Sequence, residues 1–182
     1  MKVINIFGGP GAGKSTTAAG LFHLMKLKKI NVELVTEYAK DLTWDDRTGT
    51  LEDQIYVFAK QHNRLHRLKG KVDYVVTDSP LIGGLMYAPA DLPDSFQTLV
   101  QDIWFTFENY NYSLIRVKDY TGVGRNHSHE EAVEIDKGLV ELLTDLNIKT
   151  THVCGDSMAP ELILESLNKT LAITEEEPYN EV

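Results

Sequence analysis

The sequence predicts an α/β fold in which parallel strands form a central sheet and helices pack on its faces. One observation is that short apolar segments alternate with segments of helical periodicity; the apolar segments are 3–7, 32–36, 72–77, 112–117 and 148–154. Another is that the third of them (VDYVVT) is almost continuously apolar, which is typical of a strand covered by helices on both faces. A glycine-rich loop between the first strand and the first helix is also typical of such a fold.

Length and composition indicate one globular domain. The 182 residues are 42% hydrophobic and 25% charged, which is enough for a full hydrophobic core. No apolar run reaches the roughly 20 residues that span a bilayer, and the first strand takes the place of a signal peptide, so we expect no membrane partner. The lone Cys154 fits a reducing cytoplasm. We expect a domain over 1–173 and an acidic tail over 174–182.

The glycine-rich stretch GGPGAGKS, residues 8–15, matches the phosphate-loop (Walker A) pattern G-x-x-x-x-G-K-[ST]. Its glycines allow backbone N–H groups to point at phosphate oxygens, Lys14 can reach the β- and γ-phosphates, and Ser15 can ligate Mg²⁺. We therefore predict that the chain binds a nucleoside triphosphate, with ATP and Mg²⁺ as the cofactors. The residues expected to bind it are Gly8, Gly9, Gly11, Ala12, Gly13, Lys14, Ser15 and Thr16.

The next two elements bring a carboxylate towards this loop. Residues 16–29 are predicted to form a helix, and 32–36 a strand that ends at Glu37. In a parallel α/β sheet the carboxyl ends of the strands face the ligand crevice, so Glu37 is expected to act near the γ-phosphate. The polar stretch 43–50 (TWDDRTGT) is predicted to be a loop.

Residues 51–69 are predicted to form an amphipathic helix. At about 100° per residue, its inward face contains Leu51, Ile55, Phe58, His62 and Leu65. On the opposite side lies a basic stripe of Lys60, Arg64, Arg67 and Lys71. This stripe is either a solvated face or a site for an anionic acceptor.

The strand 72–77 delivers Asp78, followed by Ser79 and Pro80. A carboxylate at the end of a buried strand, downstream of a phosphate loop, holds Mg²⁺ directly or through water; the alternative for Asp78 is a helix cap. Residues 81–93 are expected to be a loop or broken helix that lines an acceptor pocket. Asp94 or Ser95 is expected to cap the next helix. Its inward residues are expected to be Leu99, Ile103 and Phe107, with Val100 and Trp104 beside them.

The strand 112–117 leads into a glycine-containing segment, 118–128, that carries Arg125. A lid over the phosphates would place Arg125 and the preceding Arg116 where they offset the charge of a transferring phosphoryl group. The alternative for this segment is an ordinary surface loop.

The last elements are a helix, a strand and a helix. Ser128 and Glu131 form a capping box for a helix over 129–146 with Ala132, Ile135, Leu139 and Leu143 inward. The strand 148–154 and a helix from Pro160 to about 171 complete the chain.

The stretches GGPGAGKS, TEYAKDL, VVTDSP and GRNHSHEEAVEID together resemble small P-loop kinases of the nicotinamide-riboside-kinase-like AAA type found in many bacteriophages. More broadly they resemble nucleoside and nucleoside-monophosphate kinases. The resemblance implies a P-loop NTPase three-layer sandwich with strand order 2-3-1-4-5 and a lid. It also implies that Glu37 matches the general base of deoxynucleoside kinases. Asp78-Ser79-Pro80 lacks the arginine that such kinases carry after the third strand.

Three functions follow from these motifs. The first is a kinase that moves the γ-phosphate of ATP to a hydroxyl of a nucleoside, nucleotide or related small metabolite. The second is a phage DNA-modification kinase acting on a 5-hydroxymethylated pyrimidine within DNA, held through the basic stripe; a net charge of −9 weighs against it. The third is a regulatory NTPase without an acceptor. The sequence is compatible with a monomer or an oligomer. If the chain is encoded by a phage, we expect the enzyme to work in the host cytoplasm.

Overall fold

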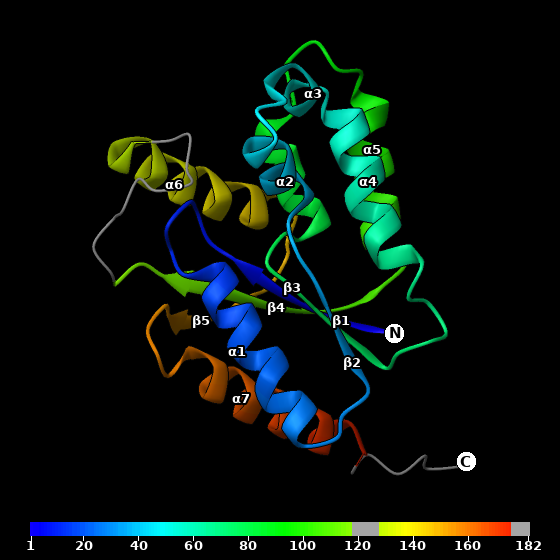
Figure 1. The fold of residues 1–182 in the computed structure, drawn as a ribbon, viewed down its shortest axis with the longest axis vertical. Helices are drawn as coiled ribbons and strands as arrows, with labels where there is room; N and C mark the ends of the chain where they lie inside the picture. Colours follow the sequence, from blue (N-terminus) through cyan, green and yellow to red (C-terminus); the bar gives the residue numbers. More distant parts are fainter. Residues whose placement is uncertain (118–127, 176–182) are drawn as a thin grey trace.

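The computed structural model describes residues 1–117 and 128–175, the last four of them by their backbone only. Its centre is a single sheet in which every neighbouring pair of strands is parallel (Figure 1). The order is β2-β3-β1-β4-β5, with β1 at Lys2–Phe7, β2 at Val32–Val35, β3 at Tyr74–Thr77, β4 at Glu108–Ile115 and β5 at Thr151–Cys154. The predicted fold class and strand order are confirmed.

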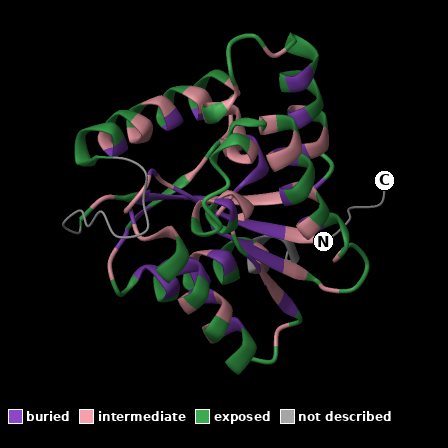
Figure 2. Cartoon of the chain, turned by 45° about the horizontal axis from the view of Figure 1, so that its top comes forward, coloured by how far each residue is buried: buried purple, intermediate pink, exposed green. Residues whose placement is uncertain are grey.

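Helices cover both faces of the sheet and make it the middle of three layers (Figure 1). On one face lie α1 (Lys14–Leu27) and α7 (Ala159–Glu175); on the other lie α4 (Gln54–His66), α5 (Asp94–Trp104) and α6 (His129–Asp145). Alternate residues of β1 enter the two cores, since Ile4 and Ile6 pack towards α1 while Val3 and Phe7 pack towards α5. The strands are accordingly mostly buried, and the helices expose their outer faces (Figure 2).

The segment after β2 differs from the prediction. The stretch 43–50 is not a single loop, because α2 (Tyr38–Trp44) and the short α3 (Thr48–Glu52) occupy most of it. The following helix begins at Gln54 and not at residue 51, because the Asp53 carboxylate accepts a hydrogen bond from the Tyr56 N–H at 3.0 Å and caps a new helix.

The inward face of α4 is also rotated from the predicted one. Phe58 and Leu65 are buried as expected, but the residue buried between them is Gln61 at 5% exposure, while His62 lies at the edge of the core. Ile55, predicted to be inward, is 53% exposed. Because the polar Gln61 occupies the inner face of α4, the buried face passes through residue 61 and not through residue 62 as predicted.

The starts of α5 and β4 also differ from the prediction. Pro93, and not Asp94 or Ser95, is the N-cap of α5. Val100, Trp104 and Phe107 are buried as expected, whereas Leu99 is 50% exposed and Phe96 is buried instead. The strand β4 begins at Glu108, before the predicted residue 112. Its early residues are polar because the buried Asn5 side chain of β1 donates to Asn109 Oδ1 and Asn111 Oδ1, both at 3.0 Å.

The remaining helices follow the prediction closely, but β5 begins at Thr151 and not at the predicted residue 148. The capping box of α6 is present, with Ser128 N–H donating to Glu131 Oε2 at 2.6 Å and Glu131 N–H to Ser128 Oγ at 3.2 Å. A 3₁₀ helix, η1 (Leu81–Tyr87), matches the broken helix expected there. Nearly all of the predicted lid (118–128) and of the acidic tail (174–182) lies outside the described residues. Within the described part of the chain, no helix is both long and apolar enough to cross a membrane.

Candidate active site

The phosphate-loop residues lie between the carboxyl end of β1 and the first turn of α1. Gly8, Gly11 and Gly13 have φ angles of 147°, 81° and 102°, a region that side chains larger than glycine rarely adopt. The predicted strand-loop-helix context is therefore present, and Ser15 and Thr16 lie in the exposed first turn of α1. A helix start of this kind presents backbone N–H groups and the positive end of the helix dipole to an anion.

Lys14 is surrounded by carboxylates. Its half-buried side chain donates a hydrogen bond from Nζ to the Gly9 carbonyl at 3.1 Å. Burial lowers the pKa of Lys14, and the neighbouring charges of Glu37, Asp78 and Asp136 oppose that effect by favouring the ammonium form. The fold thus brings together Lys14, Glu37 and Asp78, three residues that the sequence marked separately.

Asp78 directly follows β3 and is only 3% exposed. Its Oδ1 atom is buried and has no hydrogen-bond partner among the described residues. The helix-cap alternative is wrong, since the N-cap of η1 is Pro80 and no side chain caps it. A buried carboxylate oxygen left over in this way needs a ligand or a cation to satisfy it. Together with the Ser15 hydroxyl it offers the oxygen ligands that Mg²⁺ prefers, so the residues present fit that ion.

Glu37 occupies the N-cap position of α2 but its side chain does not cap that helix. The carboxylate is half-buried, and its charge acts on both Lys14 and the hydroxyl of Tyr87. Tyr87 ends η1; burial, followed by the charges of Glu37 and Asp136, raises its pKa to about 12. Its hydroxyl therefore stays protonated at neutral pH beside these carboxylates. No pattern around Tyr87 in the sequence signalled this position.

Gln61 was also missed, and it links the ends of two strands. Its Oε1 accepts from the Tyr38 N–H at 2.9 Å, and its Nε2 donates to the carbonyls of Thr36 at 3.3 Å and Ser79 at 3.4 Å. Glu37 lies between two of these partners and Asp78 precedes the third. The Gln61 amide therefore fixes the spacing between the two carboxylates across the sheet.

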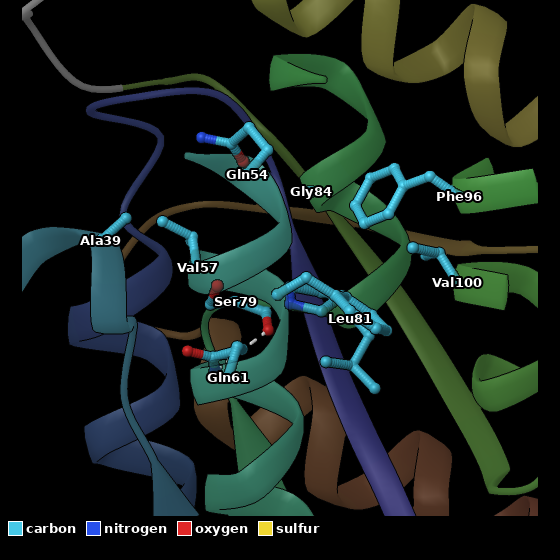
Figure 3. Close-up of a pocket in the computed structure, with 11 residues that line it drawn as sticks. Ala39, Gln54, Val57, Gln61, Ser79, Leu81, Gly84, Phe96 and Val100 are labelled. Carbon is cyan, nitrogen blue, oxygen red and sulfur yellow. Dashed lines mark hydrogen bonds between the residues drawn. The ribbon is translucent and has the colours of Figure 1, made fainter. Parts of the chain in front are cut away.

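A small cavity of about 40 Å³ lies beside Gln61, between α4, η1 and α5 (Figure 3). Phe96 and Val100 come from α5, Val57 and Gln61 from α4, and Leu81 from η1 (Figure 3). Ligand sites usually measure about 300–1,000 Å³, so this cavity holds only a few water molecules as it stands. The expectation that η1 lines a pocket is met for Leu81 and Gly84.

The predicted arginines are placed differently from one another. Arg116 donates from Nε and Nη2 to Asp136 Oδ2 at 3.0 and 2.7 Å and from Nη1 to the Pro10 carbonyl at 2.8 Å. These bonds hold the guanidinium beside the phosphate loop, and its contact with a transferring phosphoryl group stays a prediction. Arg125 lies outside the described residues.

The predicted basic stripe is not one face of a helix. The helix α4 ends at His66, so that Arg67 and Lys71 lie beyond it. Arg64 forms an ion pair with Asp41, donates to the Thr36 carbonyl at 3.0 Å and lies over the Tyr38 ring. These contacts hold α4 to the end of β2 and remove Arg64 from a free basic surface.

A glycine loop between β1 and α1, with a buried carboxylate after the neighbouring β3, defines a P-loop NTPase fold. The chain belongs to the AAA domain family, which it matches over residues 3–159. No curated protein matches the sequence.

Solved structures of deoxyadenosine kinase from M. mycoides are similar to this chain. The one with dCMP and a flexible dCDP bound has a TM-score of 0.60 at 18% identity and covers 93% of this chain and 100% of its own. The one with dATP has a TM-score of 0.56 at 20% identity, covering 92% of this chain and 100% of its own. The one with dCTP has 0.57 at 20% identity, covering 93% and 100%. This likeness establishes a shared fold.

Proposed function

We propose that the protein is an ATP-dependent phosphotransferase that moves the γ-phosphate to a hydroxyl of a nucleoside, nucleotide or related small metabolite. The observation that carries this proposal is the position of Glu37. Its carboxylate lies within electrostatic reach of Lys14, does not cap α2, and belongs to the strand end beside the cavity lined by Ala39 and Gln61. A carboxylate between a phosphate loop and a cavity suits a general base for an acceptor hydroxyl.

The remaining residues have roles that follow from their chemistry. The N–H groups of residues 11–16 and the Lys14 ammonium would hold the triphosphate. Asp78 and Ser15 would hold Mg²⁺, which neutralises charge on the phosphates when bound. Glu37 would accept the proton of the attacking hydroxyl, and the Tyr87 hydroxyl would donate a hydrogen bond near Glu37.

The acceptor side favours a flat, partly apolar ligand. Its cavity combines the Phe96 ring, which packs edge-on against Phe58, with the Gln61 and Gln54 amides. A cavity this small must widen to admit a nucleoside. That the M. mycoides enzymes of the same fold bind dATP, dCTP and dCMP supports a nucleoside or nucleotide acceptor here.

The alternatives are weaker. A phage kinase of 5-hydroxymethylated DNA in the host cytoplasm would depend on the exposed Lys60, Arg67 and Lys71, because Arg64 is bound within the chain. A regulatory NTPase without an acceptor gives no role as a base to the Glu37 carboxylate near Lys14.

The test is phosphate transfer from γ-labelled ATP to a panel of nucleosides, nucleoside monophosphates and hydroxymethylated DNA. The Glu37→Gln variant keeps the side-chain shape and removes the charge, so kcat should fall by about 10²-fold or more while ATP affinity is retained. Glu52→Gln at the exposed end of α3 is the matched control. A near-normal kcat would contradict the role of Glu37 as a general base and would favour an acceptor that is already a phosphate. ATP hydrolysis without any labelled acceptor would favour the regulatory NTPase.

A further inference from the structure

Asp136 of α6 binds the phosphate loop from a position 127 residues further along the chain. The Gly9 N–H donates to its Oδ1 at 2.5 Å, and the Arg116 guanidinium donates twice to its Oδ2. The exposed fractions of the Arg116 and Asp136 side chains are only 13% and 29%. Hydrogen bonds between charged groups in such a partly buried site are stronger than those at the surface.

These contacts immobilise the first half of the loop. The backbone of Gly9 is held on both sides. Its N–H donates to Asp136, and its carbonyl accepts from Lys14 Nζ at 3.1 Å and from the Ala12 N–H at 3.2 Å. The next carbonyl, of Pro10, accepts from Arg116 at 2.8 Å. Asp136 and Arg116 therefore bind the two peptide groups on either side of the Gly9–Pro10 peptide, just before the residues that would face phosphate.

Gly9 allows this close approach of α6. A Cβ atom at residue 9 would lie 2.5 Å from Asp136 Oδ1 and 2.8 Å from the Ala132 carbonyl. Unlike Gly8, Gly11 and Gly13, Gly9 does not have a positive φ. Glycine is needed here for space and not for backbone conformation.

We propose that Asp136 is a positioning residue that holds the phosphate loop in its nucleotide-binding shape through Gly9 and Arg116. The inference rests on the proposed binding of ATP. A loop fixed in advance loses less conformational entropy when the ligand binds, and this raises affinity without any contact between Asp136 and the nucleotide.

Charge alone predicts the opposite effect, and this makes the proposal testable. Asp136 is negative and acts on Lys14. Removing it would reduce repulsion of a polyphosphate and leave Arg116 without its carboxylate partner, so electrostatics favours tighter ATP binding in the variant. A positioning role favours weaker binding.

The experiment measures the Kd for ATP with Mg²⁺ by calorimetry for the wild type and Asp136→Ala, which removes both acceptor oxygens, at low and high salt. We expect the Kd to rise by about tenfold, and the rise to persist at high salt, since screening acts on charge and not on loop shape. Glu134→Gln is the matched control, because Glu134 forms an exposed pair with Lys137 on the same helix. Its Kd should equal that of the wild type.

A second variant separates charge from position. Gly9→Ala keeps every charge but forces α6 away from the loop, and it should weaken ATP binding to a similar degree. Thermal denaturation of each variant shows whether the binding measurement is made on folded protein. A purely structural role would lower the melting temperature without raising the Kd of the folded variants.

An unchanged or lower Kd in Asp136→Ala, with the wild type binding ATP, would overturn this inference alone. A wild type that binds no nucleoside triphosphate would overturn the proposed function as well.

Discussion

The phosphate loop and the cavity beside Glu37 meet at the carboxyl ends of the central strands, but different interactions hold them. On the loop side the described contacts are ionic, with Lys14 among three carboxylates and Arg116 paired to Asp136. On the cavity side the contacts are apolar and aromatic around one neutral amide, that of Gln61. Buried charges are poor stabilisers of a fold, whereas buried apolar surface is a good one.

We therefore expect the loop side and the cavity side to respond differently to substitution. Removing Lys14 or Asp78, which form no salt bridge among the described residues, should change catalysis or binding and leave the free energy of unfolding nearly unchanged. Removing one partner of the Arg116–Asp136 pair should also lower the free energy of unfolding. Removing a group from the cavity side should change both.

Lys14→Ala should reduce phosphotransfer by about 10³-fold or more, because the ammonium stabilises charge on the transferring phosphoryl group. Its melting temperature should stay close to that of the wild type, since burial already disfavours the charge. Transfer assays and thermal denaturation check the two statements. Lys26→Ala, at the exposed end of α1, is the control. A fully active Lys14→Ala protein would refute the central assignment.

Asp78→Asn should raise the Mg²⁺ concentration needed for half-maximal activity by about tenfold or more. Stability should hold, because the Oδ1 atom makes no hydrogen bond to a described residue that the change could break. A magnesium titration of activity is the measurement. Asp73→Asn, at the exposed opposite end of the same strand segment, should titrate like the wild type. Equal titrations for both variants would exclude Asp78 as a metal partner.

The loop side could be predicted from the sequence because its signals are local. The loop glycines and Lys14 are contiguous, and Glu37 and Asp78 each follow directly after an apolar strand. The hydrogen bond from the Gly9 N–H to Asp136 could not be predicted, because the two residues lie far apart in the sequence. Nothing in the local sequence distinguishes Asp136 from the other acidic residues of its helix.

The cavity side was predicted less well because burial there does not follow polarity. Gln61 lies inside because backbone groups satisfy its amide, and this moved the inner face of α4 away from Ile55. The polar start of β4 was missed for the same reason, since Asn109 pairs with Asn5 across the sheet. Hydrophobic periodicity cannot detect a buried polar residue whose partners are distant in sequence.

Gln61→Leu should affect both stability and turnover. It leaves the Tyr38 N–H and the Ser79 carbonyl without this partner, which should lower the free energy of unfolding by about 2 kcal/mol. We expect kcat to fall by about tenfold with an unchanged ATP Kd, because Glu37 and Asp78 lose their fixed spacing. Gln97→Leu, which replaces an exposed amide of α5 outside this cavity, is the matched control. Equal kcat values in the two variants would argue against the positioning of Glu37 by Gln61.

The smallest effect is expected from the exposed basic residues. The structure sharpens this test by excluding Arg64, because replacing Arg64 would disturb Asp41 and the end of β2 whatever the acceptor. The informative variant is therefore Lys60→Glu/Arg67→Glu/Lys71→Glu. Its control is Lys26→Glu/Lys28→Glu/Lys29→Glu at the end of α1, which changes the net charge equally.

A small acceptor that binds in the cavity would make no phosphate contact with these exposed residues. Its KM should therefore change by less than about twofold in both triple variants. Duplex DNA would behave differently. Each lost phosphate contact lowers the slope of log affinity against log salt by about 0.9, so the first variant would lose up to about three units of slope and the control none. We expect no difference between the two. A steep loss confined to the first variant would move the acceptor from a free metabolite to DNA while leaving the roles of Lys14, Glu37 and Asp78 intact.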